Sequence, residues 1–117
     1  MDFDSFTIVL LIRRDDAPEF DEAEAAALQD AHMAFLADLH DSGHLLAAGP
    51  VSDPSPEIRG VSIMNVGPEE ALALKSADPA VKAGIYRLVV LPWMTPGGAV
   101  HFTHTVMPRS IADVVGQ

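Results

Sequence analysis

The sequence contains no cysteine. This absence excludes disulfide bonds, thiolate catalysis, iron–sulfur ligation and zinc sites that use Cys. Basic residues are also few, because 7 Lys and Arg stand against 17 Asp and Glu, and the formal net charge is -10. That balance argues against nucleic acid and anionic membrane surfaces as partners, since both bind through Lys and Arg.

Long hydrophobic runs are missing as well. No apolar segment approaches the roughly 20 residues that span a bilayer. The stretch MDFDSF carries Asp and no basic region, unlike a signal peptide. We therefore expect a soluble, cytoplasmic protein with no membrane partner. Apolar residues make up 49% of the 117 positions, which is enough for one core and predicts a single folded domain.

The apolar periodicity and turn residues predict elements in the order β-α-β-β-α-β. Strands are expected at 5–14, 45–51, 60–66 and 85–93, helices at 21–42 and 67–77, and a helical turn at 78–84. This order predicts a ferredoxin-like α+β fold, an antiparallel sheet with both helices on one face. Residues 51–60 form a turn-rich connection between the second and third predicted strands.

The predicted domain spans residues 1–97, and residues 98–117 form a C-terminal extension with a candidate short strand at AVHFTHTV. The first and fourth strands are apolar on both faces, whereas two helices cover only one. We expect the bare face to include Val9, Leu11, Val89 and Leu91. Such a patch is too large for a monomer and predicts a homodimer that pairs sheet to sheet. Alternatively, the extension folds back over its own sheet.

His32 lies on the apolar stripe of the long predicted helix. Its neighbours on that stripe are Leu28, Phe35 and Leu39, and the opposite face carries Asp30, Asp38 and Asp41. A buried imidazole needs a hydrogen-bond partner. It is either a core histidine without chemistry, or a general base or acid at the mouth of a cavity between helix and sheet. The sequence spacing does not decide between these two interpretations of His32.

Several short sequence elements follow one another along the chain in a recognisable order. They are His32, the Gly43 stop, Ala48-Gly49-Pro50, Gly60, Asp78-Pro79 and Pro92-Trp93. In this order and spacing, residues 5 to 94 resemble the YCII-related family of the dimeric α/β-barrel superfamily. The resemblance implies a ferredoxin-like unit that dimerises sheet to sheet, with a His–Asp pair, here His32 and Asp78, beside a small pocket. It also implies a family that includes enzymes, one branch of which removes chloride from chlorinated hydroxyhydroquinones.

Asp78 also has a structural interpretation. An Asp before Pro at the start of a helical turn is a typical N-cap and stabilises the turn by about 1 kcal/mol. Both roles fit one side chain, because a carboxylate has two oxygens. One oxygen would cap amides near Val81 while the other orients His32, as the third member of a catalytic triad does. Without Cys or a Ser in an elbow motif, covalent acyl transfer is not expected.

Four arginines lie in or beside the predicted strands: Arg13, Arg14, Arg59 and Arg87. They could bind a carboxylate or phenolate substrate, or simply solubilise strand ends and pair across a dimer. The predicted substrate-binding set is Arg14, Phe35, Leu46, Trp93 and His101. Phe35, Leu46 and Trp93 are expected to line the pocket, and His101 to reach it from the extension.

The remaining histidines do not form a convincing metal site. His101 and His104 are three residues apart, so in a strand they would point to opposite faces. His40 and His44 flank Gly43 and suggest a solvated helix end. We assign no metal and no cofactor.

The leading hypothesis is a small homodimeric enzyme in which His32, supported by Asp78, transfers protons on a small aromatic or lactone-like substrate. The alternative is a dimer module that binds a small ligand without catalysis, or an accessory subunit, with His32 as a polar contact.

Overall fold

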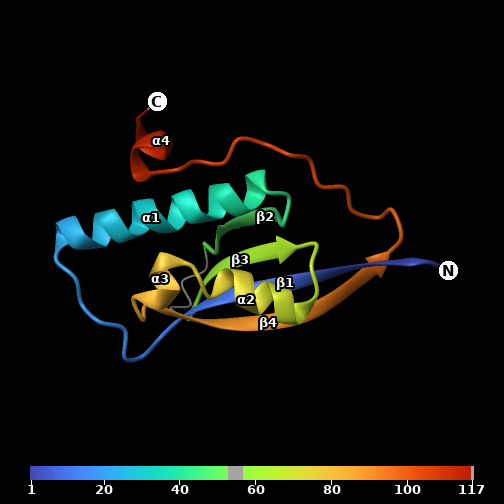
Figure 1. Cartoon of the computed structure of the whole chain (residues 1–117), viewed down its shortest axis with the longest axis horizontal. Coiled ribbons are helices and arrows are strands. Elements are labelled where there is room, and N and C mark those ends of the chain that lie inside the picture. Colours follow the sequence, from blue (N-terminus) through green and yellow to red (C-terminus); the bar gives the residue numbers. More distant parts are fainter. Residues whose placement is uncertain (53–56, 117) are drawn as a thin grey trace.

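The computed structural model describes residues 1–52 and 57–116 and contains a four-stranded antiparallel sheet in the order β2-β3-β1-β4 (Figure 1). The elements are β1 (Phe3–Arg13), α1 (Glu22–Asp41), β2 (Leu45–Pro50), β3 (Ile58–Met64), α2 (Pro68–Lys75), α3 (Pro79–Lys82), β4 (Tyr86–Pro96) and α4 (Ile111–Val115). This arrangement confirms the predicted ferredoxin-like α+β fold. The turn-rich connection predicted at 51–60 includes residues 53–56, which lie outside the described residues.

Helix α1 is one residue shorter at each end than the predicted helix 21–42, because Asp21 and Ser42 are its caps. The Asp21 carboxylate accepts a hydrogen bond from the Glu24 amide at 2.7 Å, which satisfies an amide that the helix cannot. At the other end the backbone passes into Gly43 with φ +89°, a conformation that glycine adopts without a Cβ clash. The predicted helix and its Gly43 stop are confirmed.

The connection between α2 and β4 contains the short helix α3. Pro79 occupies its first turn, where a missing amide proton costs nothing, and the Asp78 side chain accepts from the Ala80 amide at 2.9 Å. The expected N-cap is therefore present, and its donor is the amide of Ala80, next to Val81. Because α3 packs against α1, this cap holds Asp78 beneath the long helix.

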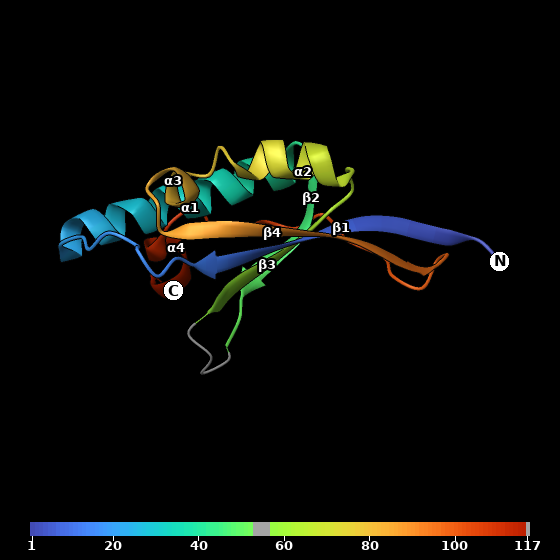
Figure 2. The ribbon, with the colours of Figure 1, turned by 90° about the horizontal axis from the view of Figure 1, so that it is seen from below.

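The helices α1, α2 and α3 all lie on one face of the sheet (Figure 2). The core between them is built on Val9, Leu39, Leu45, Met64 and Ala71. In β1, Val9 is opposite Val90 of β4, whereas Leu91 is opposite Ile8. Directly opposed residues share a face, so Val9 and Leu91 point to opposite sides.

The prediction that grouped Val9 and Leu11 with the bare face was therefore wrong, because strand side chains alternate and these two face the helices. The open face instead carries Ile8, Leu10, Val61, Ile63, Val89 and Leu91, which are opposed in register across three strands. Leu91 is 43% exposed. The predicted apolar open face is thus present, but β1 contributes Ile8 and Leu10 to it instead of Val9 and Leu11.

The extension after β4 runs back along α1 and ends in α4 (Figure 1). Residues 99–106 form no strand, so the short strand predicted at AVHFTHTV was wrong. The physical reason is that the extension leaves the sheet: the Thr105 amide donates to the His40 ring at 3.0 Å instead of to a neighbouring strand. It touches the open face where Phe102 packs edge-on against Phe6, with ring centroids 5.3 Å apart.

Candidate active site

His32 and Asp78 are hydrogen bonded in the interior of the molecule. The His32 Nδ1 atom lies 2.7 Å from Oδ2 of Asp78, whose side chain is completely buried. The other carboxylate oxygen, Oδ1, accepts from the Ala80 amide. Because both carboxylate oxygens are engaged, the orientation of Asp78 is fixed, and a carboxylate can only accept, so Nδ1 of His32 carries a proton. The ring nitrogen Nε2 is then the one available for chemistry.

A second buried polar group lies next to this pair. Lys75, at the end of α2, has no exposed surface, and its Nζ atom donates to Oγ of Ser62 at 3.0 Å. Burial lowers the pKa of the Lys75 ammonium from 10.5 to about 8, while the charge of Asp78 acts in the opposite direction. Sequence reasoning missed Lys75. The available signal was its spacing of four from Ala71, which places both residues on the buried face of α2.

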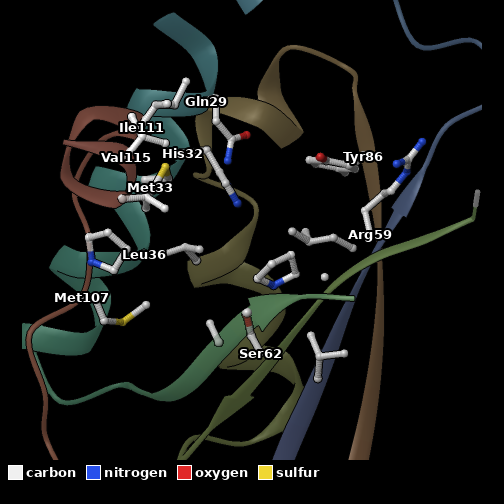
Figure 3. A pocket seen from close by; sticks show the side chains of 18 residues that line it. Gln29, His32, Met33, Leu36, Arg59, Ser62, Tyr86, Met107, Ile111 and Val115 are labelled. Carbon is white, nitrogen blue, oxygen red and sulfur yellow. The ribbon is translucent and has the colours of Figure 1, made fainter. Parts of the chain in front are cut away.

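His32 and Ser62 both line a pocket of about 480 Å³ between α1, the sheet and the extension (Figure 3). This volume fits a small organic molecule. Its wall is mainly apolar, with polar side chains at a few places: Gln29, His32, Arg59, Ser62 and Tyr86. The Tyr86 ring is tilted against His32 with centroids 6.2 Å apart. One apolar hollow with a few convergent polar groups is the usual form of a ligand site.

The hollow exists because the sheet beneath it carries small residues. Ala48, Gly49, Gly60 and Ser62 lie in β2 and β3 and line the pocket. A Cβ added at Gly60 would lie 3.2 Å from Cδ1 of Leu11, so a larger residue there would crowd the sheet side of the pocket. The sequence AAGP and the glycine of RGVSIM thus provide space for a ligand.

The predicted substrate-binding residues lie elsewhere. Arg14 pairs with Asp16 in the loop after β1, at 2.7 Å and exposed to solvent. Phe35 packs against the core, and Leu46 lies where the β2–β3 register shifts. The Trp93 ring is tilted against Phe6 with centroids 5.8 Å apart, and His101 is exposed. None of the five is among the described residues that line the pocket.

Their misplacement has a geometric reason. The pocket lies along the flank of α1, so it contacts Gln29, Met33 and Leu36 beside His32. Phe35 and Leu36 both pack against the core, but only Leu36 also lines the pocket. At 100° per residue, a shift of one position is enough to turn a side chain away from the pocket.

The predicted solvated helix end at His40 was also wrong. His40 is 4% exposed, its Nδ1 atom lies 2.7 Å from the Leu45 carbonyl, and Nε2 accepts from Thr105. His104 of the extension stacks on His40 with centroids 4.5 Å apart and pairs with Asp41. The extension therefore buries this end of α1.

Two further findings come from the described part of the chain. Residues 1–52 and 57–116 contain no group of three His, Cys, Asp or Glu side chains placed to hold a metal ion. Among those same residues, every helix is too short or too polar to cross a membrane.

Comparison with known proteins decides the family. The family model of the YCII-related domain matches residues 7–94, which run from within β1 almost to the end of β4. The chain belongs to the YCII-related domain family. His32 and Asp78 lie within the matched segment, whereas the extension that forms part of the pocket lies after it.

Solved structures that are similar to this YCII-related protein include the following two. One is 5-chloro-2-hydroxyhydroquinone dehydrochlorinase from Burkholderia phenoliruptrix AC1100, in complex with 2,5-dihydroxybenzoquinone. It has a TM-score of 0.52 and 21% identity, over 75% of this chain and 92% of that chain. The other is a dimeric protein of unknown function and ferredoxin-like fold from Bacteroides fragilis NCTC 9343. It has a TM-score of 0.46 and 15% identity, over 78% and 95%. A search of curated proteins gives no match.

Proposed function

We propose that this YCII-related protein is a small enzyme in which His32, held by Asp78, transfers protons to and from a small aromatic or lactone-like substrate in the pocket. The observation that carries the proposal is the 2.7 Å contact between Nδ1 of His32 and the completely buried Asp78 carboxylate. A carboxylate in this place orients the ring, fixes the Nδ1–H tautomer and supplies a counter-charge when His32 takes up a proton.

The proton moves through the other ring nitrogen. Nε2 of His32 takes a proton from a hydroxyl or an acidic C–H of the substrate and returns it to another atom, which shifts a double bond with no net gain or loss of atoms. About a tenth of the His32 side chain remains accessible, so a ligand in the pocket can reach it. General acid–base catalysis of this kind contributes about 10²- to 10⁴-fold to the rate.

Ser62 and Lys75 supply the second part of the mechanism. Ser62 accepts a hydrogen bond from Lys75, so its own hydroxyl proton is free to point toward a substrate oxygen. A donor fixed before the substrate binds stabilises the negative charge that develops on oxygen as a proton leaves. Ser62 is thus assigned to bind the reacting oxygen, and Lys75 is a positioning residue behind it.

The test follows proton exchange directly. Hydroxyhydroquinone and an enolisable butenolide are incubated in D₂O without oxygen, and deuterium uptake at carbon is followed by NMR. Chloride release from 5-chloro-2-hydroxyhydroquinone, the compound named for the Burkholderia enzyme, is measured in parallel. We expect enzyme-dependent exchange with at least one compound and about 10²- to 10⁴-fold slower exchange in His32→Gln. Equal rates in the wild type and His32→Gln would contradict the proposal.

A second candidate function is ligand binding without turnover. The apolar wall of the pocket favours it, because apolar surface supplies affinity without any chemical group. The same experiment separates the two functions: binding of these compounds to the pocket with no exchange and no chloride release would support a binding module.

We also propose that the protein is a homodimer joined through the open sheet face. The support is the registered apolar surface of Ile8, Leu10, Ile63, Val89 and Leu91, which the helices do not cover. A two-fold axis would set this surface against its own copy and bury it.

A further inference from the structure

The C-terminal extension forms one wall of the candidate active site. Met107, Pro108, Ile111, Val114 and Val115 line the pocket, and every one of these side chains is apolar. They lie after residue 94, where the match to the YCII-related domain ends. This part of the pocket therefore comes from residues that the family model does not include.

The wall is attached to α1 at several points. The Arg109 guanidinium donates to Asp38 at 2.8 Å and to Asp41 at 2.7 Å, and the Ile111 amide donates to Asp30 at 2.7 Å. These three aspartates lie on one face of α1 and act together as an acidic docking strip. The contact between Thr105 and His40 adds a fourth attachment. Hydrogen bonds and ion pairs thus hold the extension against α1.

The pocket has a polar end and an apolar end. In Figure 3, Ile111, Val115 and Met107 lie on one side, Tyr86 and Arg59 lie on the other, and His32 lies between them. Met33 and Leu36 of α1 continue the apolar side. A small polar ring bound at His32 would leave this apolar surface facing water, which is unfavourable.

We propose that residues 107–115 determine the specificity of the site, and that its substrates carry a hydrophobic substituent next to the polar group that meets His32. This inference rests on the proposed function only in taking the pocket as the site where substrate binds. The substrate class is therefore an alkyl- or aryl-substituted phenol or enol. The substituent lies against Met107 and Ile111, and the hydroxyl faces the polar end.

The five methionines of the chain can report where a ligand binds, because they lie in different parts of the molecule. Met33 and Met107 line the pocket from α1 and from the extension. Met64 is buried in the core, and Met1 and Met94 are 98% and 60% exposed. Labelling the methionine methyl groups with ¹³C therefore separates binding in the pocket from adsorption elsewhere.

The experiment titrates phenol, 4-ethylphenol and 4-butylphenol into the full chain and follows these methyl signals by NMR. We expect the signals of Met33 and Met107 to shift, and binding to tighten by up to about fourfold for each methylene that the wall buries. Ile111→Ser should reduce this gain to less than about twofold per methylene. The matched control is Val106→Ser, because Val106 is 94% exposed and does not line the pocket, and it should behave as the wild type.

The inference is overturned if the gain in affinity per methylene is equal in Ile111→Ser and Val106→Ser. It is also overturned if the phenols do not shift the methyl signals of Met33 and Met107. Thermal melts of both variants show that they are folded. Failure of the proposed function has a different signature. If the wild type shows the chain-length preference but no proton exchange, the wall is supported and the catalytic role of His32 is not.

Discussion

His32 and Asp78 are separated by 46 residues in the chain, yet their side chains meet at 2.7 Å in the interior. The long helix supplies the imidazole, and the N-cap of α3 supplies the carboxylate. The cap fixes one oxygen of Asp78 on the Ala80 amide, which turns the other toward His32. One side chain thus stabilises a local turn and orients a buried histidine, and the two contributions can be separated by mutation.

Asp78→Asn and Asp78→Ala separate the cap from the orientation of His32. Asparagine keeps an oxygen for the Ala80 amide, so we expect it to cost about 1 kcal/mol of stability. Alanine removes the cap and leaves a buried imidazole without its partner, and should cost about 2–4 kcal/mol. Urea melts at pH 7 measure both. Equal losses in the two variants would show that the cap is not what Asp78 contributes.

The buried Lys75 makes stability depend on alkaline pH. In the unfolded chain this lysine holds its proton up to about 10.5, whereas in the folded protein its pKa is about 8. Between these values the unfolded state binds more protons, so a rise in pH favours the folded state. The free energy of unfolding contributed by Lys75 should therefore increase by about 2–3 kcal/mol from pH 8 to pH 10.5.

The control is Lys75→Met, which keeps the length of the side chain and removes the charge. Urea melts across this pH range should show the increase in the wild type and its absence in the variant, after the titrations common to both cancel. A difference between the two proteins that is constant with pH would contradict a lowered pKa for Lys75.

Arg109 should hold the extension against α1. Arg109→Gln removes both contacts to Asp38 and Asp41, so amide hydrogen exchange of residues 105–111 should quicken severalfold while the rest of the chain is unchanged. High salt should weaken the same attachment in the wild type, because these charges are exposed. Lys82→Gln changes the charge equally at an exposed site on α3 and serves as the control. Unchanged exchange in Arg109→Gln would mean that the apolar contacts suffice.

The open sheet face predicts how the protein assembles. Leu91→Lys places a charge in that face, and in a symmetric dimer it places two, so self-association should weaken by at least about a hundredfold. Leu72→Lys is the matched control, because Leu72 is a leucine of similar exposure on α2, at 47% against 43%. Analytical ultracentrifugation should find dimers for the wild type and Leu72→Lys and monomers for Leu91→Lys. A monomeric wild type would refute the interface.

The sequence carries most of the fold because its local signals agree with one another. The Gly43 stop and the Asp78-Pro79 start each mark a boundary that the structure keeps. The placement of His32 on the buried side of α1 also follows from periodicity, because burial repeats with the helical turn.

The finer features of the site depend on contacts between distant segments. The sequence predicts a solvated helix face for Asp30, Asp38 and Asp41. Only the path of the extension shows that these carboxylates bind the Arg109 side chain and the Ile111 amide. The residue type alone predicts that Lys75 is exposed, because lysine is rarely buried without a partner. Its partner, Ser62, lies on another element. No periodicity within one segment encodes such pairings.

The most direct test of the central claim is chemical rescue of His32→Ala. In that variant, exchange of the hydroxyhydroquinone ring hydrogens in D₂O should fall by about 10²- to 10⁴-fold. Added imidazole should restore part of the rate, because it can occupy the vacated space and be held by Asp78. It should restore much less in His32→Ala/Asp78→Asn, where the carboxylate is gone. If His32→Ala exchanges as fast as the wild type, or if imidazole acts equally on both variants, the His32–Asp78 pair is not the proton-transfer group.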